Sequence, residues 1–241
     1  MRLIVWDFDG TLAFREGRWT GTLCDVLAAR APRLLAAREA LRVQLQTGFP
    51  WHQPEIGHPH LSSPDLWWAN LTPLFIRAFC AAGAEPELAE LLAGEIRSGY
   101  CDPRRWTLYP DTIATLSSLT ELGWTHVVLS NHVPELEQII ASLGLSKFFR
   151  RVVSSAVLGY EKPHPQAYAA VTFGLEPPEE IWMVGDSFEA DYAGPERFGW
   201  KSILVRQAHS QAARFSEALS GIAAVMKTAQ PGARVSGGSS S

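Results

Sequence analysis

Five short runs of apolar residues constrain the fold of this chain more than any other feature of its sequence. Each run is rich in β-branched and aromatic side chains, which is typical of a strand buried on both faces. In a chain of 241 residues they are RLIVWD at 2–7, HVVLSN at 126–131, RRVVSSA at 150–156, IWMVGD at 181–186 and KSILVR at 201–206. Strands of this kind belong to parallel sheets, so a parallel sheet is predicted.

From about residue 110 onward, these runs alternate with segments of helical periodicity. Four such helical segments lie at 110–123, 133–144, 164–174 and 188–199. Each of them ends at a glycine, which is a common helix stop. Alternating strands and helices favour right-handed crossovers with helices on both faces of the sheet. The predicted fold class is therefore α/β, with a Rossmann-like parallel sheet core.

The residues between the first two runs have a different texture. Three segments there carry apolar residues at helical spacing, namely 20–46, 63–83 and 86–99. Because structureless loops of this total length are rare in compact domains, residues 14–108 are predicted to form an inserted helical domain. Residues 1–13 and 109–228 would then form the sheet core. The Gly- and Ser-rich residues 229–241 are predicted to be a disordered tail.

Charge and cysteine content argue against several classes of partner. The formal net charge of −4 provides no basic field for nucleic acid or anionic lipid. The three cysteines match neither a disulfide framework nor a zinc-binding spacing. No apolar run approaches the roughly 18 residues of a membrane span, and the first residues lack a signal-peptide pattern, so the expected compartment is the cytoplasm. No pattern predicts an oligomeric state.

Polar residues lie at or just beyond the carboxyl ends of four predicted strands, where open parallel sheets bind ligands. In chain order they are Asp7, Asp9, Gly10 and Thr11, then Ser130 and Asn131, then Lys162, then Asp186 and Asp191. Carboxylates crowded at one edge repel one another unless a cation lies among them, and oxygen ligands suit Mg²⁺. A lysine, a hydroxyl and a tight glycine turn beside Mg²⁺ suit a phosphoryl group. The predicted chemistry is phosphoryl transfer with bound Mg²⁺.

Four of these stretches resemble the motifs of the haloacid dehalogenase-like (HAD) hydrolase superfamily, in the same order. They are DFDGT at 7–11, LSN at 129–131, the lysine of YEKPHP at 160–165 and GDSFEAD at 185–191. The helical insertion lies between the first and second motifs. This position is similar to that in family members with an inserted helical cap, such as the phosphoglycolate phosphatase-like branch. The resemblance covers the sheet core, and the insertion itself matches no motif.

The resemblance implies a role for each residue that matches a motif. Asp7 would be the nucleophile that forms an aspartyl-phosphate, and Asp9 would protonate the leaving group and then activate water. Mg²⁺ would be held by the Asp7 carboxylate, the Asp9 main-chain carbonyl and Asp186. The residues that would hold the phosphoryl group are Ser130, Asn131, Lys162 and Gly10. Asp191 and Thr11 would contact the metal ligands and hold them in position.

Asp9 also bears on the type of reaction. In the family that the chain resembles, members that cleave carbon–halogen bonds lack this second aspartate, because a halide leaves without a proton. The presence of Asp9 here therefore favours phosphate ester hydrolysis over dehalogenation. A phosphonate-cleaving relative would need a lysine in the cap, and residues 14–108 contain none. The expected substrate is a small phosphorylated metabolite. A sugar phosphomutase, or a non-catalytic phosphate-binding or protein-interaction module on the same fold, are the alternatives.

Charged and polar residues of the insertion have more than one interpretation. His52, His58 and His60 lie in a Pro-rich loop and are interpreted as polar loop residues, since no Cys or carboxylate shares a zinc-binding spacing with them. The tryptophans of the insertion are expected mainly in its core, with a minority facing the substrate. Arg15 and Arg18 are either solvated charges at the hinge or contacts for an anionic group of the substrate.

Overall fold

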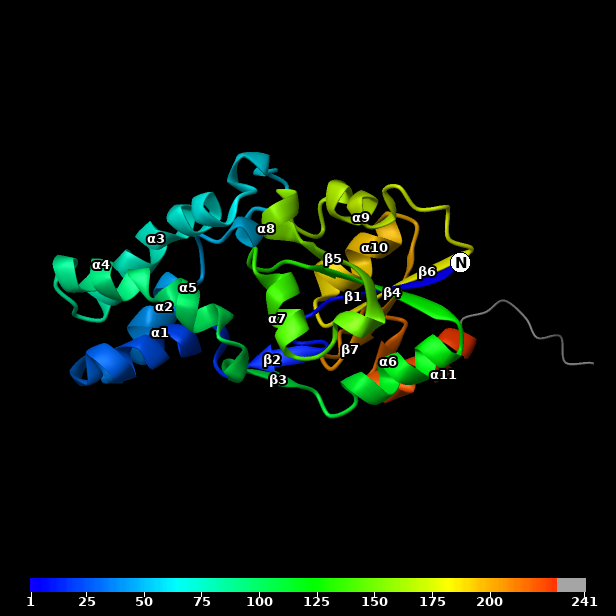
Figure 1. The fold of residues 1–241 in the computed structure, drawn as a ribbon, viewed down its shortest axis with the longest axis horizontal. Coiled ribbons are helices and arrows are strands. Elements are labelled where there is room, and N and C mark those ends of the chain that lie inside the picture. The colour runs from blue at the N-terminus through cyan, green and yellow to red at the C-terminus, as the bar shows by residue number, and fades with distance from the viewer. Residues whose placement is uncertain (229–241) are drawn as a thin grey trace, which may run out of the picture.

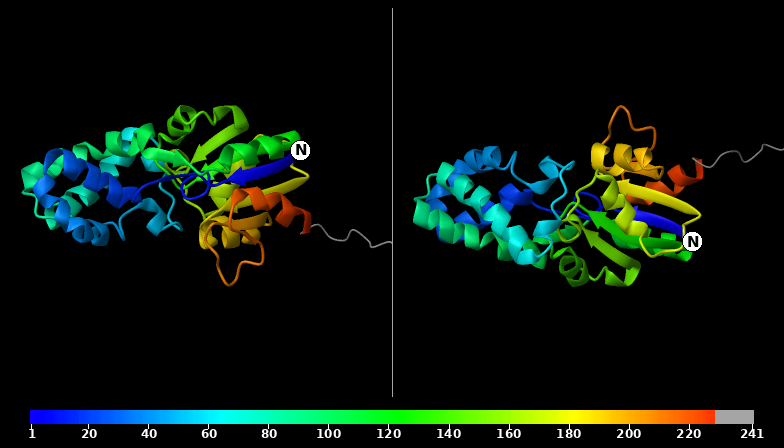
Figure 2. Two further views of the ribbon diagram at one scale, coloured as in Figure 1. Left: turned by 90° about the horizontal axis from the view of Figure 1, so that it is seen from below. Right: turned by 90° about the horizontal axis from the view of Figure 1, so that it is seen from above.

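The computed structural model describes residues 1–228, and the predicted tail at 229–241 lies outside the described residues. Two parts follow one another along the long axis of the molecule (Figure 1). A sheet with flanking helices forms one part. Residues 18–101, which contain several helices and lie in the chain between β1 (Arg2–Trp6) and β4 (Trp124–Ser130), form the other, here called the helical part. Figure 2 shows the same division from two further directions.

The sheet has six strands in the order β5-β4-β1-β6-β7-β8, and every neighbouring pair is parallel. The remaining strands are β5 (Phe149–Ser154), β6 (Glu180–Gly185), β7 (Lys201–Val205) and β8 (Phe215–Ser216). The predicted α/β fold is confirmed, and the five apolar runs form five of the six strands. The edge strand β8 is absent from the prediction because two residues carry no periodic signal.

Strand β1 shows why the sheet needs cover on both faces. Successive side chains of a strand face opposite sides, and all of Leu3, Ile4, Val5 and Trp6 are fully buried. Leu3 and Val5 belong to the apolar cluster that includes α9 (Pro165–Thr172). Ile4 and Trp6 belong to the second cluster, which includes α6 (Thr112–Glu121), α7 (Leu136–Ser142) and α11 (Ile222–Thr228). The run without polar alternation therefore corresponds to a central strand.

Two shorter helices, α8 (Ser155–Leu158) and α10 (Gly194–Arg197), complete the sheet part. The segment 188–199 differs from the single helix that its sequence predicts. A π-helical turn occupies Phe188–Ala193, and α10 begins only after it. Pro195 lies in the first turn of α10, where its missing N–H breaks no hydrogen bond of the helix.

A two-stranded antiparallel ribbon joins the two parts. It consists of β2 (Ala13–Arg15) and β3 (Trp106–Leu108), which pair Ala13 with Leu108 and Arg15 with Trp106. The chain enters the helical part through β2 and leaves it through β3. The predicted limits of the insertion, 14 and 108, both fall within this ribbon, and the division of the chain there stays a prediction.

The helical part contains five α-helices, with 3-10 turns between α1 and α2 and between α2 and α3. They are α1 (Arg18–Arg30), α2 (Arg38–Gln44), α3 (Pro64–Ala81), α4 (Pro86–Gly94) and α5 (Ile96–Cys101). The segment 20–46, predicted as one helical run, is interrupted. Helix α1 ends at Arg30, and Pro32, which has no N–H to continue an α-helix, begins a separate 3-10 turn.

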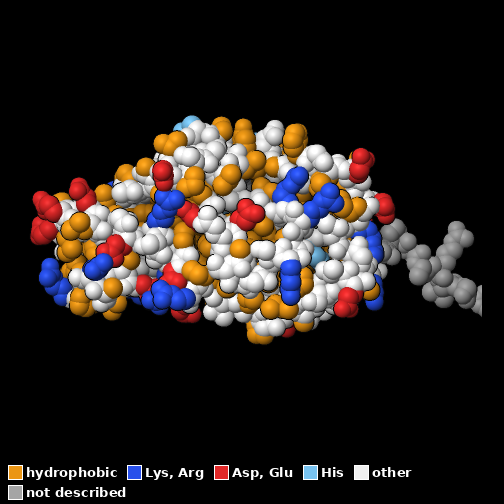
Figure 3. Space-filling view, in the orientation of Figure 1, with side chains coloured by type: hydrophobic (Ala, Val, Ile, Leu, Met, Phe, Trp, Pro, Cys, Tyr) orange, Lys and Arg blue, Asp and Glu red, His pale blue; other side chains and the backbone are white. Residues whose placement is uncertain are grey.

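The surface shows no large region of a single charge on the face drawn in Figure 3, where acidic and basic side chains are interspersed. Within residues 1–228, no helix combines the length and the apolar character needed to cross a bilayer. The expected absence of nucleic-acid and membrane partners stays a prediction.

Candidate active site

The carboxyl ends of β4, β1 and β6 lie side by side because these strands are parallel neighbours in the sheet. Ser130 ends β4, Asp7 follows β1, and Asp186 follows β6. The loop after α8 brings Lys162 to the same edge. These four side chains line one cavity of about 530 Å³, and Asp9, Asn131 and Asp191 line it too. The structure thus brings together most of the residues that the motifs single out.

Asp7 is almost fully buried at the centre of this cluster. Its Oδ1 accepts hydrogen bonds from Ser130 Oγ at 2.8 Å and from Lys162 Nζ at 2.9 Å. Lys162 also donates to Asp191 Oδ1 at 2.6 Å, so one buried ammonium faces two carboxylates. Burial lowers the pKa of Lys162, but the charges of Asp191 and Asp7 outweigh this effect and hold the pKa above its ordinary value. A charged lysine therefore compensates Asp7.

Three carboxylates form a compact oxygen cluster. Asp7, Asp186 and Asp191 each offer an oxygen within 4.8 Å of the others. Burial raises the pKa of Asp186 to about 7, and the charge of Asp7 adds to the shift. Burial also raises the pKa of Asp191 to about 7, against the opposing effect of Lys162. Because one lysine does not balance three carboxylates and all donors are oxygens, the cluster fits a hard divalent cation.

Asp191 and Thr11 hold their neighbours in place. Both oxygens of Asp191 already accept hydrogen bonds, one from Lys162 Nζ and one from the main-chain N of Ser187 at 3.0 Å. Thr11 is fully buried, and its Oγ1 lies 3.4 Å from Asp7 Oδ2. These contacts are compatible with the supporting role predicted for both residues.

Asp9 has a different environment from Asp7, although both follow the same strand. Its Oδ1 is buried and has no hydrogen-bond partner among the described residues. Burial raises the pKa of Asp9 to about 7; Arg18 opposes the shift, Asp7 adds to it and Arg15 opposes it. A carboxyl with such a pKa can both give and accept a proton near neutral pH.

Gly10 and Asn131 both contact main-chain atoms of neighbouring loops or turns. Gly10 has a φ of +90°, and a Cβ there would lie 2.3 Å from Asp186 Oδ2, so only glycine fits. Its N–H donates to the Ala13 carbonyl at 2.8 Å and is therefore engaged within the turn. Asn131 Nδ2 donates to the Lys162 carbonyl at 2.8 Å, and its Oδ1 accepts from the Lys162 N–H at 2.7 Å. Asn131 thus holds the loop of Lys162, and phosphate contacts by either residue stay predictions.

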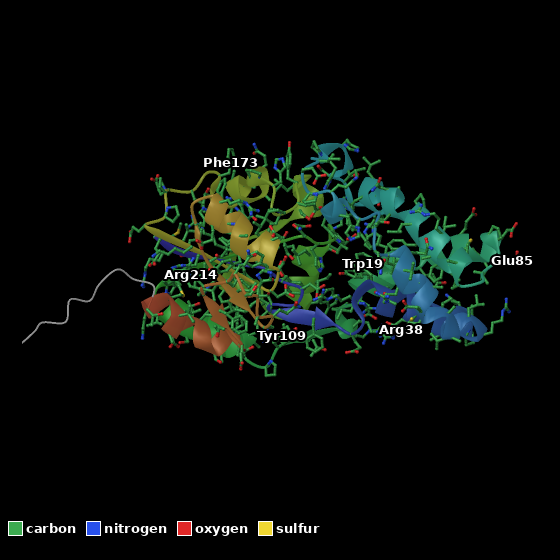
Figure 4. All side chains as sticks on the ribbon, turned by 180° about the vertical axis from the view of Figure 1, so that it is seen from behind. Trp19, Arg38, Glu85, Tyr109, Phe173 and Arg214 are labelled. Atoms are coloured by element: carbon green, nitrogen blue, oxygen red, sulfur yellow. The ribbon has the colours of Figure 1, made fainter. Side chains whose placement is uncertain are left out.

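The helical part contributes Arg18, Trp19, Trp51 and Tyr100 to the same cavity. Trp19 in α1 stacks on Tyr100 in α5 with ring centroids 3.8 Å apart. Figure 4 shows Trp19 at the junction of the two parts. The sequence does not single out Trp19 or Tyr100, because aromatic residues at helical spacing indicate a core as readily as a site.

Arg15 and the loop histidine His58 make contacts outside this cavity. Arg15 is buried, and it donates to Thr22 Oγ1 at 2.7 Å and to Asp25 Oδ2 at 2.9 Å. Burial excludes the interpretation of Arg15 as a solvated charge. His58 Nε2 lies 3.1 Å from Glu161 Oε1. Within residues 1–228, the aspartate cluster is the one group with the geometry of a metal site.

Comparison with known proteins gives matches over most of the chain. A family model described as haloacid dehalogenase-like hydrolase matches residues 1–199. Phosphoserine phosphatase from Thermus thermophilus is 30% identical over 229 residues, covering 85% of this chain and 88% of that protein. (S)-2-haloacid dehalogenase from Xanthobacter autotrophicus is 32% identical over 211 residues, covering 83% of this chain and 77% of that protein. The solved HAD-hydrolase YfnB from Bacillus subtilis shares the fold, with a TM-score of 0.70 at 16% identity over 94% of this chain and 98% of that one.

Proposed function

The chain belongs to the haloacid dehalogenase-like hydrolases, and from this we propose that it is a Mg²⁺-dependent phosphatase of a small phosphorylated metabolite. The observation that carries the proposal is a second carboxyl group, that of Asp9, in the cavity that holds Asp7. Burial raises the pKa of Asp9 to about 7. An alkoxide leaving group needs a proton, whereas a halide does not. Asp9 therefore supports phosphate ester hydrolysis over dehalogenation, although relatives of both kinds resemble the chain.

Asp7 is the proposed nucleophile. Its carboxylate attacks phosphorus, so that a bond forms between Asp7 and phosphorus while the bond to the leaving oxygen breaks. Asp9 gives its proton to that oxygen, and the alcohol departs. Lys162 and Ser130, which both contact Asp7 Oδ1, hold the phosphoryl oxygens and offset the repulsion between the phosphate and Asp7.

The second half of the reaction reverses the role of Asp9. Now ionised, it takes a proton from a water molecule, which attacks the phosphorus of the aspartyl-phosphate and releases inorganic phosphate. Asp7 and Asp9 are thereby restored. In this proposal residues 14–108 form a cap, and its Trp19 and Tyr100 side chains limit the access of bulk water to the intermediate.

The proposed metal ligands are the carboxylates of Asp7 and Asp186 and the main-chain carbonyl of Asp9, with Asp191 and Thr11 behind them. Their donor atoms are all oxygens, which fits Mg²⁺. When bound, Mg²⁺ supplies positive charge beside the nucleophile and the phosphoryl oxygens.

Release of phosphate from p-nitrophenyl phosphate tests the proposal. We expect turnover in the presence of Mg²⁺ and its loss when EDTA removes the metal. Asp7→Asn, which keeps the shape of the side chain but removes the nucleophilic carboxylate, should lose turnover as well. Turnover by Asp7→Asn at the wild-type rate would contradict the proposed nucleophile.

The same preparation distinguishes the alternatives. Halide release from a 2-haloacid without phosphatase activity would indicate a dehalogenase. Activation by a sugar bisphosphate with little release of free phosphate would indicate a phosphomutase. Binding of inorganic phosphate without turnover of any ester would indicate a non-catalytic module. Each of these outcomes would reject the phosphatase proposal.

A further inference from the structure

Arg18 reaches the cavity through an uncommon backbone conformation. It is the first residue of α1 and has a φ of +49°, directly after Gly17 with a φ of +66°. Residues other than glycine seldom adopt positive φ, and such strain concentrates at active sites and ligand-binding positions. These two residues turn the chain so that α1 begins with Arg18 at the cavity.

Arg18 is also the less engaged of the two cations that line the cavity. The other, Lys162, donates to two carboxylates at 2.6 and 2.9 Å. Arg18 makes one contact, from Nη2 to Asp186 Oδ2 at 3.5 Å, and its side chain is 58% exposed. A guanidinium has five N–H donors, so most of those on Arg18 have no acceptor among residues 1–228.

Arg18 comes from the helical part, whereas Ser130 and Lys162, which would hold the phosphoryl group, come from the sheet part. Arg18 therefore corresponds to the leaving-group side of the proposed reaction, and it lines the same cavity as Asp9, the proposed proton donor. An anionic group near the leaving oxygen would therefore come within reach of the guanidinium. Trp19 and Tyr100 line the same cavity and provide apolar surface for the carbon atoms of the leaving group.

The charge already present in the cavity favours a partner with a single negative charge. Five carboxyl groups line it, and their potential charge exceeds that of Arg18, Lys162 and the proposed Mg²⁺ together; they are Asp7, Asp9, Asp186, Glu189 and Asp191. A second phosphate would add about two negative charges at neutral pH, whereas a carboxylate adds one. A planar carboxylate also matches the fork of a guanidinium, which can donate two parallel hydrogen bonds to it.

We propose that Arg18 selects the substrate by binding a carboxylate on the leaving group, so that the substrates are small phosphorylated carboxylic acids. The inference rests on the proposed phosphatase function. Because Arg18 would contact the alcohol portion of the ester, its removal should affect esters that carry the carboxylate more strongly than esters that lack it. If Arg18 merely offsets the acidic cluster, its removal would affect every ester alike.

Hydrolysis of a matched pair of esters, 2-phosphoglycolate and ethyl phosphate, tests the proposal. In the wild type we expect kcat/KM to be about 30-fold higher for phosphoglycolate, as for a charge-assisted hydrogen-bonded pair. Arg18→Met should abolish this preference, so that kcat/KM falls about 30-fold more for phosphoglycolate than for ethyl phosphate. Arg18→Lys, which keeps the charge but not the fork, should retain an intermediate preference.

Arg30→Met is the matched control. Arg30 lies on the same helix, its side chain is similarly exposed at 61%, and it pairs with Glu95 instead of lining the cavity. We expect this variant to hydrolyse both esters at wild-type rates. Circular dichroism of each variant checks that the fold is retained.

Two outcomes would overturn the role of Arg18 while leaving the proposed function intact. One is an equal loss for both esters in Arg18→Met, which would indicate a general electrostatic effect. The other is a wild type that hydrolyses p-nitrophenyl phosphate but shows no preference for phosphoglycolate, a result that needs no variant. If the wild type hydrolyses no ester at all, the phosphatase function and the inference are both rejected.

Discussion

At the scale of single residues, Asp7 and Asp9 show how two carboxyls in one loop acquire different chemistry. Asp7 accepts hydrogen bonds from Ser130 and Lys162, whose charge compensates it. Asp9 has a buried oxygen with no partner among the described residues, and burial raises its pKa to about 7. Burial and partners, rather than residue type, therefore separate the proposed nucleophile from the proposed acid.

Asp9→Asn should lower kcat/KM for an alkyl phosphate by about 100-fold or more, because the leaving alkoxide loses its proton donor. The loss should be smaller for p-nitrophenyl phosphate, since p-nitrophenolate leaves readily without a proton. Inorganic phosphate should inhibit the variant as it inhibits the wild type. Steady-state kinetics on the two esters measures these effects. Equal losses on both esters would contradict the role of Asp9 as proton donor.

His126 links the stability of the sheet to pH. Its Nδ1 accepts a hydrogen bond from Trp6 Nε1 at 3.0 Å, and its Nε2 lies 3.1 Å from Thr120 Oγ1, whose hydroxyl donates to the Leu116 carbonyl. These partners fit the neutral ring with its proton on Nε2. Burial lowers the pKa of His126 to about 4, with a smaller opposing effect of the Leu116 carbonyl. The folded state therefore resists protonation of this ring.

Because histidine in an unfolded chain has a pKa near 6.5, the unfolded state binds more protons and His126 destabilises the fold as the pH falls. Between pH 7 and pH 5 this loss should reach about 2 kcal/mol. His126→Asn, which keeps an acceptor for Trp6, should show a correspondingly weaker pH dependence in urea denaturation. The exposed His60→Asn should keep the wild-type dependence. The same pH dependence in His126→Asn and wild type would refute this contribution.

At the scale of elements, polar contacts join the helical part to the loops that carry the candidate site. Glu135, in the loop after β4, accepts from Trp68 Nε1 at 3.1 Å and from Arg97 Nε at 2.8 Å. Glu161, in the loop of Lys162, lies 3.1 Å from His58 Nε2. The helical part is therefore attached at two points close to the residues proposed to bind phosphate.

His58→Ala should lower the free energy of unfolding by about 2 kcal/mol, because it leaves a buried polar group without its hydrogen-bond partner. The Glu161 side chain is fully buried, and its Oε2 has no partner among residues 1–228, so the variant would leave both oxygens of this carboxyl group without a hydrogen-bond partner. Urea denaturation measures the change. His60→Ala is the control, because His60 is exposed and its removal should change the stability by less than about 0.5 kcal/mol. Equal stability of the two variants would show that the pair contributes nothing.

Local patterns predict long elements better than short ones. The five longer strands of the main sheet each carry an apolar run, whereas β2 and β3 have three residues each and pair with one another outside that sheet. The segment 188–199 carries helical periodicity, yet it folds as a π-helical turn and α10. That turn includes Asp191, which contacts Lys162 at 2.6 Å. The departure from the pattern therefore occurs at the candidate site.

At the scale of the whole molecule, the cavity is built by segments that are far apart in the chain. Asp7 and Lys162 are separated by 155 positions and yet form a 2.9 Å contact. The sheet edge supplies the carboxylates, and the helical part supplies Arg18 and the aromatic walls. Chemistry common to the family would thus come from one part and choice of substrate from the other.

The sequence by itself determined the fold class and most members of the candidate site. Apolar runs without alternation favour strands of a covered parallel sheet, and parallel strands then bring their polar ends to one edge; the run at 150–156 forms the half-buried edge strand β5. Only the tertiary structure decided the partners of each side chain: the Gly10 amide is engaged in its turn, Asn131 holds the loop of Lys162, and Arg18 lines the cavity. Such contacts depend on distances between remote segments, and those distances follow from packing rather than from any local pattern of residues.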